Sequence, residues 1–107
     1  MSKTLEQVRT LVAHGEVQVS IHGYEELADD DLHMRDLIDG LASAVLVEDY
    51  PGYPKGRCVL VLEQDRMKQP IHVLWGIPAG QNFQAVVITA YRSDPARWDK
   101  TWLGRKS

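Results

Sequence analysis

The apolar residues change their spacing near residue 43, and this change restricts the fold more than any other feature of the sequence. Before it, Leu5 and Val8, and then Met34, Leu37 and Leu41, follow the three- and four-residue steps of amphipathic helices. After it, apolar and polar residues alternate with the period of two that half-buried strands show. Helices followed by closely connected strands are typical of an α+β domain, with N-terminal helices packed on one face of a mainly antiparallel sheet.

Residues with capping chemistry divide these two regions into elements. Ser2 and Ser20 are expected N-caps, Gly15 ends the first helix, and Asp31 precedes the third. Trp98 and Trp102, four residues apart, indicate a last helical turn that docks on the domain. Residues 16–21 alternate and allow one short strand. Further helices are expected over about 22–30 and 32–42, and a sheet of about four strands over about 44–49, 57–64, 70–77 and 84–92.

The length and composition indicate one small domain. The 107 residues are enough for a single core, so residues 1–107 are expected to fold together. No apolar run approaches the roughly 20 residues of a membrane span, and the start of the chain lacks the pattern of a signal peptide. Cys58 is a lone cysteine, which excludes an internal disulfide. These features predict a cytoplasmic protein that does not associate with membranes.

Neither a metal site nor a cofactor is predicted. The four histidines and Cys58 lack the spacing of known metal-ligand motifs. No glycine-rich loop precedes a helix in the manner of a phosphate-binding loop. The acidic residues of 25–31 lack the glycine and the spacing of a calcium loop, and we interpret them as a solvated helix end.

Charge is distributed unevenly along the chain. Residues 1–54 hold three basic residues against eleven acidic ones, a net −8, whereas residues 55–107 hold nine against four, a net +5. Such asymmetry fits either a half that meets an anionic partner or two halves that attract each other within one fold. The overall charge of −3 argues against tight non-specific binding to nucleic acid, which depends on many phosphate contacts.

Alternation also predicts which strand residues face the helices and which face outward. The expected inward sets are Ile71, Val73, Trp75 and Ile77; Cys58, Leu60 and Leu62; and Val86, Ile88 and Ala90. The expected outward sets are His72, Leu74 and Gly76; Arg57 and Glu63; and Ala85, Val87, Thr89 and Tyr91. This interpretation gathers Arg57, His72, Thr89 and Tyr91 on one open face.

Side chains of this kind suit metal-independent cleavage of RNA. That reaction needs a base for the ribose 2′-hydroxyl, an acid for the leaving oxygen and a cation near the phosphate. His72 and His22 are the candidates for proton transfer near neutral pH. Arg57 or Arg92 is the candidate phosphate ligand, and Tyr91 is placed to stack on a base or donate a hydrogen bond.

Five short motifs resemble the bacterial domain-of-unknown-function family 4258. In order, they are Ser20-Ile21-His22-Gly23, Glu48-Asp49-Tyr50-Pro51, Arg57-Cys58-Val59-Leu60, Ile71-His72-Val73-Leu74, and Ile88-Thr89-Ala90-Tyr91 followed by Asp94-Pro95-Ala96-Arg97-Trp98. The resemblance covers about residues 17–99, which leaves the first helix and the basic C-terminal tail as additions.

The resemblance implies a layout similar to that of the RelE/ParE-like toxins, small ribonucleases in which helices precede an antiparallel sheet. By that analogy the catalytic residues are His22, Arg57, His72, Thr89 and Tyr91, and the partners are RNA and an antitoxin-like protein of a toxin-antitoxin pair. Where family members continue the histidine helix with an arginine and further basic residues, this chain has the acidic segment 25–31. An acidic helix beside a phosphate site repels RNA, so this departure argues against catalysis.

Two hypotheses of different class follow. The first is a toxin-type, metal-independent endoribonuclease, which predicts that the face of His72 and Tyr91 is open and basic and that an RNA backbone can reach His72 or His22. A His72 that is sealed in the core would contradict this hypothesis. The alternative is a non-catalytic protein-binding or dimerisation module of the same fold. It predicts an open sheet face on which Val59, Val61, Leu74 and Val87 form an exposed apolar patch.

Overall fold

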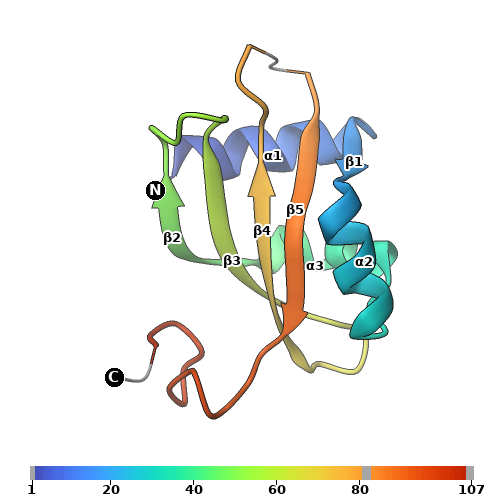
Figure 1. Cartoon of the computed structure of the whole chain (residues 1–107), viewed down its shortest axis with the longest axis vertical. Coiled ribbons are helices and arrows are strands. Elements are labelled where there is room, and N and C mark those ends of the chain that lie inside the picture. Colours follow the sequence, from blue (N-terminus) through green and yellow to red (C-terminus); the bar gives the residue numbers. More distant parts are fainter. Residues whose placement is uncertain (1, 81–82, 106–107) are drawn as a thin grey trace.

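In the part of the chain that the structure describes, a five-stranded sheet and three α-helices form the fold (Figure 1). The computed structural model describes residues 2–80 and 83–105. The sheet order is β1-β5-β4-β3-β2, and β2 to β5 form the expected antiparallel meander. The elements in chain order are α1 (Lys3–Ala13), β1 (Val17–Val19), α2 (Ile21–Asp29), α3 (Met34–Gly40), the 3₁₀ turn η1 (Leu41–Ser43), β2 (Val45–Tyr50), β3 (Cys58–Gln64), β4 (Pro70–Gly76) and β5 (Ala85–Arg92).

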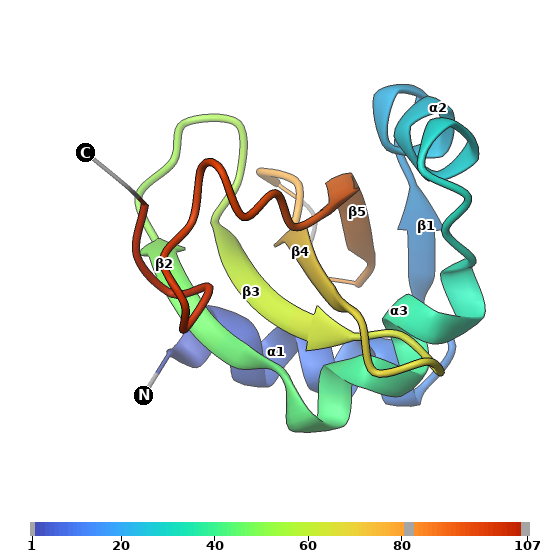
Figure 2. The same ribbon diagram turned by 90° about the horizontal axis from the view of Figure 1, so that it is seen from below.

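Helices α1 and α3 lie on one side of the sheet and the C-terminal segment lies on the other (Figure 2). Helices α1 and α3 cover one face, and apolar residues of both helices pack there against β3, β4 and β5. Residues 93–105, here called the C-terminal segment, cross the opposite face, while α2 lies near β1 at one edge of the sheet. The described part of the chain contains no helix long and apolar enough to cross a membrane. The α+β class and the mainly antiparallel sheet are therefore confirmed.

The expected number of about four strands is too low, because β1 joins the sheet as a fifth. Val17, Gln18 and Val19 pair in parallel with Ala85, Val86 and Val87 of β5. Alternation over residues 16–21 allowed a short strand, but three residues carry too little periodicity to show that it pairs. β1 lies at the edge of the sheet, where β5 is its neighbour and runs in the same direction.

The predicted helix starts are confirmed at both serines. Ser2 Oγ accepts a hydrogen bond from Leu5 N–H at 3.1 Å, and Ser20 Oγ accepts one from Gly23 N–H at 2.9 Å. The third helix is shorter than expected and ends in η1. The helical turn expected from Trp98 to Trp102 is wrong. Trp98 forms an isolated antiparallel bridge with Arg105, Trp102 has a φ of +65°, and the one turn, closed by the hydrogen bond from Trp98 N–H to Asp94 C=O at 3.1 Å, lies before Trp98.

The face assignment predicted for β3 is wrong. Val59 and Val61 pair with Trp75 and Val73 of β4, so they face the helices, and both are fully buried. Glu63 shares their face and is buried rather than outward, whereas Cys58, Leu60 and Leu62 lie on the other face. Both sets of β3 contain apolar residues, so alternation alone could not distinguish them.

A β-bulge in β5 corrects the assignment of that strand. Trp75 pairs with Val87 and Leu74 pairs with Thr89, which leaves Ile88 as an extra residue. The extra residue shifts the alternation by one position. Ala85 and Val87, expected outward, are therefore fully buried against the helices, as is Ala90, whereas Thr89 and Tyr91 face outward as predicted. Val86 and Ile88, expected inward, are only partly buried.

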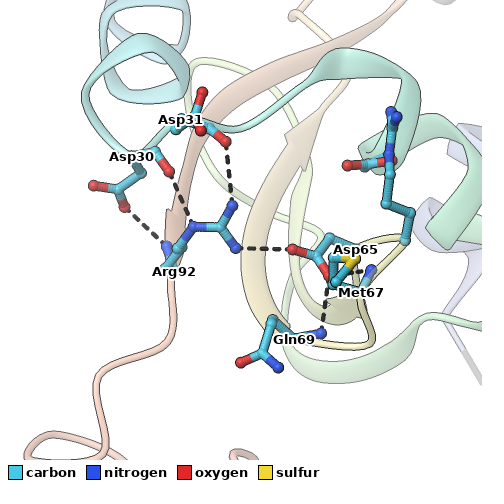
Figure 3. Close-up of polar contacts among 8 residues, drawn as sticks. Asp30, Asp31, Asp65, Met67, Gln69 and Arg92 are labelled. Atoms are coloured by element: carbon cyan, nitrogen blue, oxygen red, sulfur yellow. Dashed lines mark hydrogen bonds and ion pairs between the residues drawn. The ribbon is translucent and has the colours of Figure 1, made fainter.

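Arg92 connects the end of α2 to the turn between β3 and β4 (Figure 3). Its guanidinium donates to Asp30 C=O at 3.0 Å, to Asp31 C=O at 3.2 Å and to Asp65 Oδ2 at 2.9 Å. Asp30 Oδ2 accepts from the Arg92 backbone N–H at 2.9 Å. Burial works to raise the pKa of Asp65, but the hydrogen bonds from Arg92, Gln69 and Met67 hold it below its ordinary value. Arg92 is thus a structural residue and not the phosphate ligand considered above.

We expect Arg92→Ala to lower the free energy of unfolding by about 2–4 kcal/mol, because it leaves the Asp65 carboxylate, 5% exposed, without its cation. Urea unfolding near neutral pH measures this change. The matched control is Arg35→Ala, which removes an exposed pair with Asp39 and should cost less than about 0.5 kcal/mol. Equal losses in the two variants would contradict the structural role of Arg92.

Glu63 is the most unusual residue of the core. Its side chain is 2% exposed, its Oε2 accepts from Trp75 Nε1–H at 2.9 Å, and its Oε1 has no hydrogen-bond partner. Burial raises the pKa of Glu63 to about 8, against the opposing effects of the Trp75 hydrogen bond and the charge of Arg9. The folded protein therefore holds this proton at neutral pH, where an unfolded chain has released it.

The free energy of unfolding should therefore fall as the pH rises from about 5 to about 8, because over this range the unfolded chain binds fewer protons than the folded one. Glu63→Gln keeps an acceptor for Trp75 and removes the titrating group, so we expect the variant to be less sensitive to pH. Urea unfolding at several pH values measures both slopes. Identical slopes would show that Glu63 titrates normally in the folded protein.

Candidate functional site

Helix α2 begins where Ser20 meets the bulge of β5. Ser20 N–H donates to Val87 C=O at 3.0 Å, and Ser20 Oγ donates to Ile88 C=O at 3.0 Å. A Cβ on Gly23 would lie 2.7 Å from the Val87 carbonyl oxygen, so glycine is needed for this close approach of helix to strand. These contacts fix the first turn of α2, which carries His22, beside β5.

His22, Glu26 and Thr89 form a hydrogen-bonded chain. His22 Nε2 lies 2.5 Å from Glu26 Oε1, and Thr89 Oγ1 donates to the same oxygen at 2.7 Å. Because an ionised carboxylate only accepts hydrogen bonds, the neutral His22 ring carries its proton on Nε2 and presents Nδ1 as a proton acceptor. The His22 side chain is 69% exposed, so this nitrogen is accessible. The arrangement is that of a general base oriented by a carboxylate.

Two adjoining hollows lie beside this chain on the outward face of the sheet. The larger is a cleft of about 730 Å³, which we call the polar cleft, lined by Glu26, Tyr91, Asp94, Ala96, Arg97, Trp98 and Arg105. The smaller, of about 330 Å³, we call the tyrosine pocket, and it is lined by Tyr50, Tyr53, Cys58, Leu60, Leu74, Ile88, Thr89, Tyr91 and Arg105. Tyr91 and Arg105 line both hollows and mark the boundary between them.

Tyr91 is a half-buried phenol in contact with both hollows. Burial raises the pKa of Tyr91 above its ordinary value, so the hydroxyl remains protonated at neutral pH. Its register position opposite His72 places the two rings in a stacked arrangement, with centroids 5.5 Å apart. Tyr91 is therefore a hydrogen-bond donor, and a proton donor, at the junction of the two hollows.

His72 lies on the predicted face of β4, but the C-terminal segment seals it. The ring is fully buried and stacks on Trp98 at a centroid distance of 3.8 Å. His72 Nε2–H donates to Trp102 C=O at 2.8 Å, and its Nδ1 lies 2.6 Å from Ser93 Oγ, which donates to it in the neutral ring. Burial lowers the pKa of His72. The structure thus gives this histidine a docking role. This finding contradicts the enzyme hypothesis in the form stated from the sequence, so any proton transfer has to rely on His22 without His72.

Arg57 does not join the other candidates. Arg57 Nε donates to Gln7 Oε1 of α1 at 2.8 Å, and both residues lie with Glu6, Thr10 and Leu11 around a separate hollow on α1. The expected cluster of four residues on one open face is therefore wrong for Arg57. The prediction placed Arg57 and Glu63 on the outward face of β3, whereas this set of β3 residues faces the helices.

The apolar patch predicted for the binding alternative is also wrong in its residues. Val59, Val61 and Val87 are fully buried against the helices, and only Leu74 of that set lies on the outward face. The outward face is nevertheless apolar at its centre, because Leu60 and Ile88 accompany Leu74 in the tyrosine pocket.

The two arginines of the polar cleft are partly neutralised by carboxylates. Arg105 pairs with Glu48 of β2 and lies over the Trp98 ring, 4.8 Å from its centroid. Hydrogen bonds from Tyr50 and Arg105 lower the pKa of Glu48, which is therefore ionised. Arg97 is largely exposed, and its Nε lies 4.0 Å from Oδ2 of Asp94. Within residues 2–80 and 83–105, no three His, Cys, Asp or Glu side chains come together in a group that could hold a metal ion.

Sequence reasoning missed Glu26, Arg97 and Arg105. Glu26 could have been found, because it stands four residues after His22 on a predicted helix and so lies on the same helix face. No local signal identified the arginines, because they lie in an irregular segment whose position depends on the docking of Trp98.

We expect Trp98→Ala to weaken the docking of the C-terminal segment by about 3 kcal/mol, because the side chain is 3% exposed and stacks on His72. The population with an undocked segment then rises about a hundredfold, and proteolysis within residues 93–105 accelerates accordingly. Leu103→Ala, at a 41% exposed position of the same segment, is the control and should change little. Unchanged proteolysis of the Trp98 variant would refute the docking role.

Comparison with known proteins supports a family assignment for the core of this chain. Residues 19–92 match the family described as Domain of unknown function (DUF4258). The match includes α2 and strands β2 to β5, and therefore His22, Glu26, Thr89 and Tyr91, whereas α1 and the C-terminal segment lie outside it. Comparisons with curated proteins and with solved structures found no match. Since the matched residues make up more than half of the chain, the protein belongs to the DUF4258 family.

Proposed function

We propose that this protein is a metal-independent endoribonuclease that uses His22 for proton transfer, with a layout of the RelE/ParE type. The observation that carries the proposal is the short contact between Nε2 of the exposed His22 ring and Oε1 of Glu26, because Glu26 lines the polar cleft, although His22 itself does not. The order of helices before an antiparallel meander also supports the proposed layout. RNA, an antitoxin-like protein and a second copy of the chain stay predicted partners.

In the proposed reaction, His22 Nδ1 takes the proton of a ribose 2′-hydroxyl. The 2′-oxygen attacks the adjacent phosphorus, the bond to the 5′-oxygen breaks, and a 2′,3′-cyclic phosphate forms. Glu26 holds Nε2–H and stabilises the imidazolium ion. The Tyr91 hydroxyl protonates the leaving 5′-oxygen, and Arg97 and Arg105 donate to the phosphoryl oxygens as charge develops there.

The acidic segment 25–31 opposes this reaction less than its composition implies. The Asp30 carboxylate accepts from the Arg92 backbone N–H, and the main-chain carbonyls of Asp30 and Asp31 accept from the Arg92 guanidinium (Figure 3). Alternation along β5 places Arg92 and Tyr91 on opposite sides of the sheet. Glu26 is the residue of this segment that lines the polar cleft, and in the proposed mechanism it orients the base. The other carboxylates of the segment are not among the residues that line the cleft, so their repulsion of RNA acts there over a longer distance.

Incubation of the purified protein with total RNA in the presence of EDTA tests the proposal. We expect cleavage that leaves 2′,3′-cyclic phosphate ends, and we expect His22→Ala to reduce its rate by about 10²- to 10⁴-fold. Tyr91→Phe, which keeps the ring and removes the hydroxyl, should also cleave RNA more slowly than the parent protein. His14→Ala is the matched control, because this exposed histidine lies at the end of α1 and outside the cleft.

RNA that stays intact with the parent protein would refute the proposal and favour the non-catalytic binding or dimerisation module. Cleavage that persists in His22→Ala would refute the assigned base. Cleavage that EDTA abolishes would refute metal independence.

A further inference from the structure

The tyrosine pocket has the form of a binding site for a flat, largely apolar group. Its volume of about 330 Å³ lies in the range of small-molecule sites, and its floor is Leu60, Leu74 and Ile88. Tyr50 and Tyr53 stand at its rim from β2 and the turn after it. Tyr53 is 52% exposed, so its ring is accessible to a ligand.

The polar groups of the pocket lie on the side that meets the polar cleft. Tyr91, Thr89 and Arg105 line that side, and Thr89 is bonded to Glu26, the partner of His22. A ligand that places a flat ring in the tyrosine pocket therefore has its polar end directed toward the guanidinium of Arg105 and toward the His22–Glu26 pair. A nucleotide has such a flat ring and such a polar end, because its base lies on one side of the sugar and its phosphate on the other.

The charge balance also favours a base as the occupant. In the polar cleft Arg97 pairs with Asp94 and Arg105 pairs with Glu48, and the Glu26 carboxylate lines the same cleft, so attraction of phosphate is weak there. Single-stranded RNA is commonly held by stacking of unpaired bases on aromatic side chains, and such stacking does not require excess positive charge. On this surface the aromatic pocket, rather than the arginines, must supply most of the affinity.

We propose that the tyrosine pocket binds one unpaired nucleobase of single-stranded RNA, stacked on Tyr53, and so positions the neighbouring ribose at His22. The inference rests on the proposed function for the identity of the nucleic acid. Duplex RNA is excluded as a ligand of the pocket, because a paired base cannot leave the helix without unstacking. Binding should depend only weakly on salt, in contrast to proteins that bind mainly through phosphate contacts.

Fluorescence anisotropy with a short single-stranded oligodeoxynucleotide tests the proposal, because this probe offers bases and phosphates but no 2′-hydroxyl to react. We expect Tyr53→Ala to weaken binding roughly ten- to a hundredfold and Tyr53→Phe, which keeps the ring, to bind like the parent. Tyr24→Ala is the matched control, since Tyr24 is 70% exposed on α2 and does not line the pocket. A DNA duplex of the same sequence should bind poorly.

The outcomes separate this inference from the proposed function. Binding that Tyr53→Ala weakens, together with RNA that the parent leaves intact, would support the base pocket and refute the ribonuclease. RNA cleavage with unchanged binding by Tyr53→Ala would refute the base pocket alone. Equal losses in Tyr53→Ala and Tyr24→Ala, steep loss of binding with salt, or an absence of any binding would each overturn the inference.

Discussion

The bulge at Ile88 determines how the two faces of the sheet are used. One extra residue in β5 lets Val87 and Ala90 both face the helices, while Thr89 and Tyr91, which would otherwise share the face of Val87, lie on the outward side. The carbonyl groups exposed by the bulge also receive Ser20, the cap of α2. Because α2 is fixed at this position, Glu26 reaches Thr89 and His22 reaches Glu26. Core packing and the candidate site therefore depend on the same local distortion.

A second constraint comes from charge. The acidic first half of the chain and the basic second half meet in specific ion pairs, Arg66 with Asp36 and Arg105 with Glu48. In these pairs, the opposite charges of the two halves of the chain attract each other within the fold. The charge asymmetry also leaves the polar cleft with opposing charges, which is why base stacking rather than phosphate attraction carries the proposed binding of RNA.

Much of the fold was predictable, because local signals agreed with the final structure. The serine caps, the helical spacing of Leu5 and Val8, and the turn chemistry between strands act over a few residues and need no knowledge of the rest of the chain. The faces of β3 were not predictable, since Leu60 and Val61 are equally apolar and only pairing with β4 distinguishes them. Glu63 is tolerated in the core because the Trp75 indole donates to it, a contact between two strands.

The sequence by itself determined the α+β class, the antiparallel meander and a family-typical core that includes His22, Thr89 and Tyr91. These depend on short-range periodicity and on motifs that are contiguous in the chain. Only the tertiary structure decided that His72 is sealed beneath Trp98, that Arg57 binds to α1, and that Arg105 lies beside Tyr91. Each of these is a contact between residues far apart in sequence, and its geometry is set by the bulge, the strand register and the docking of an irregular segment, none of which leaves a local pattern.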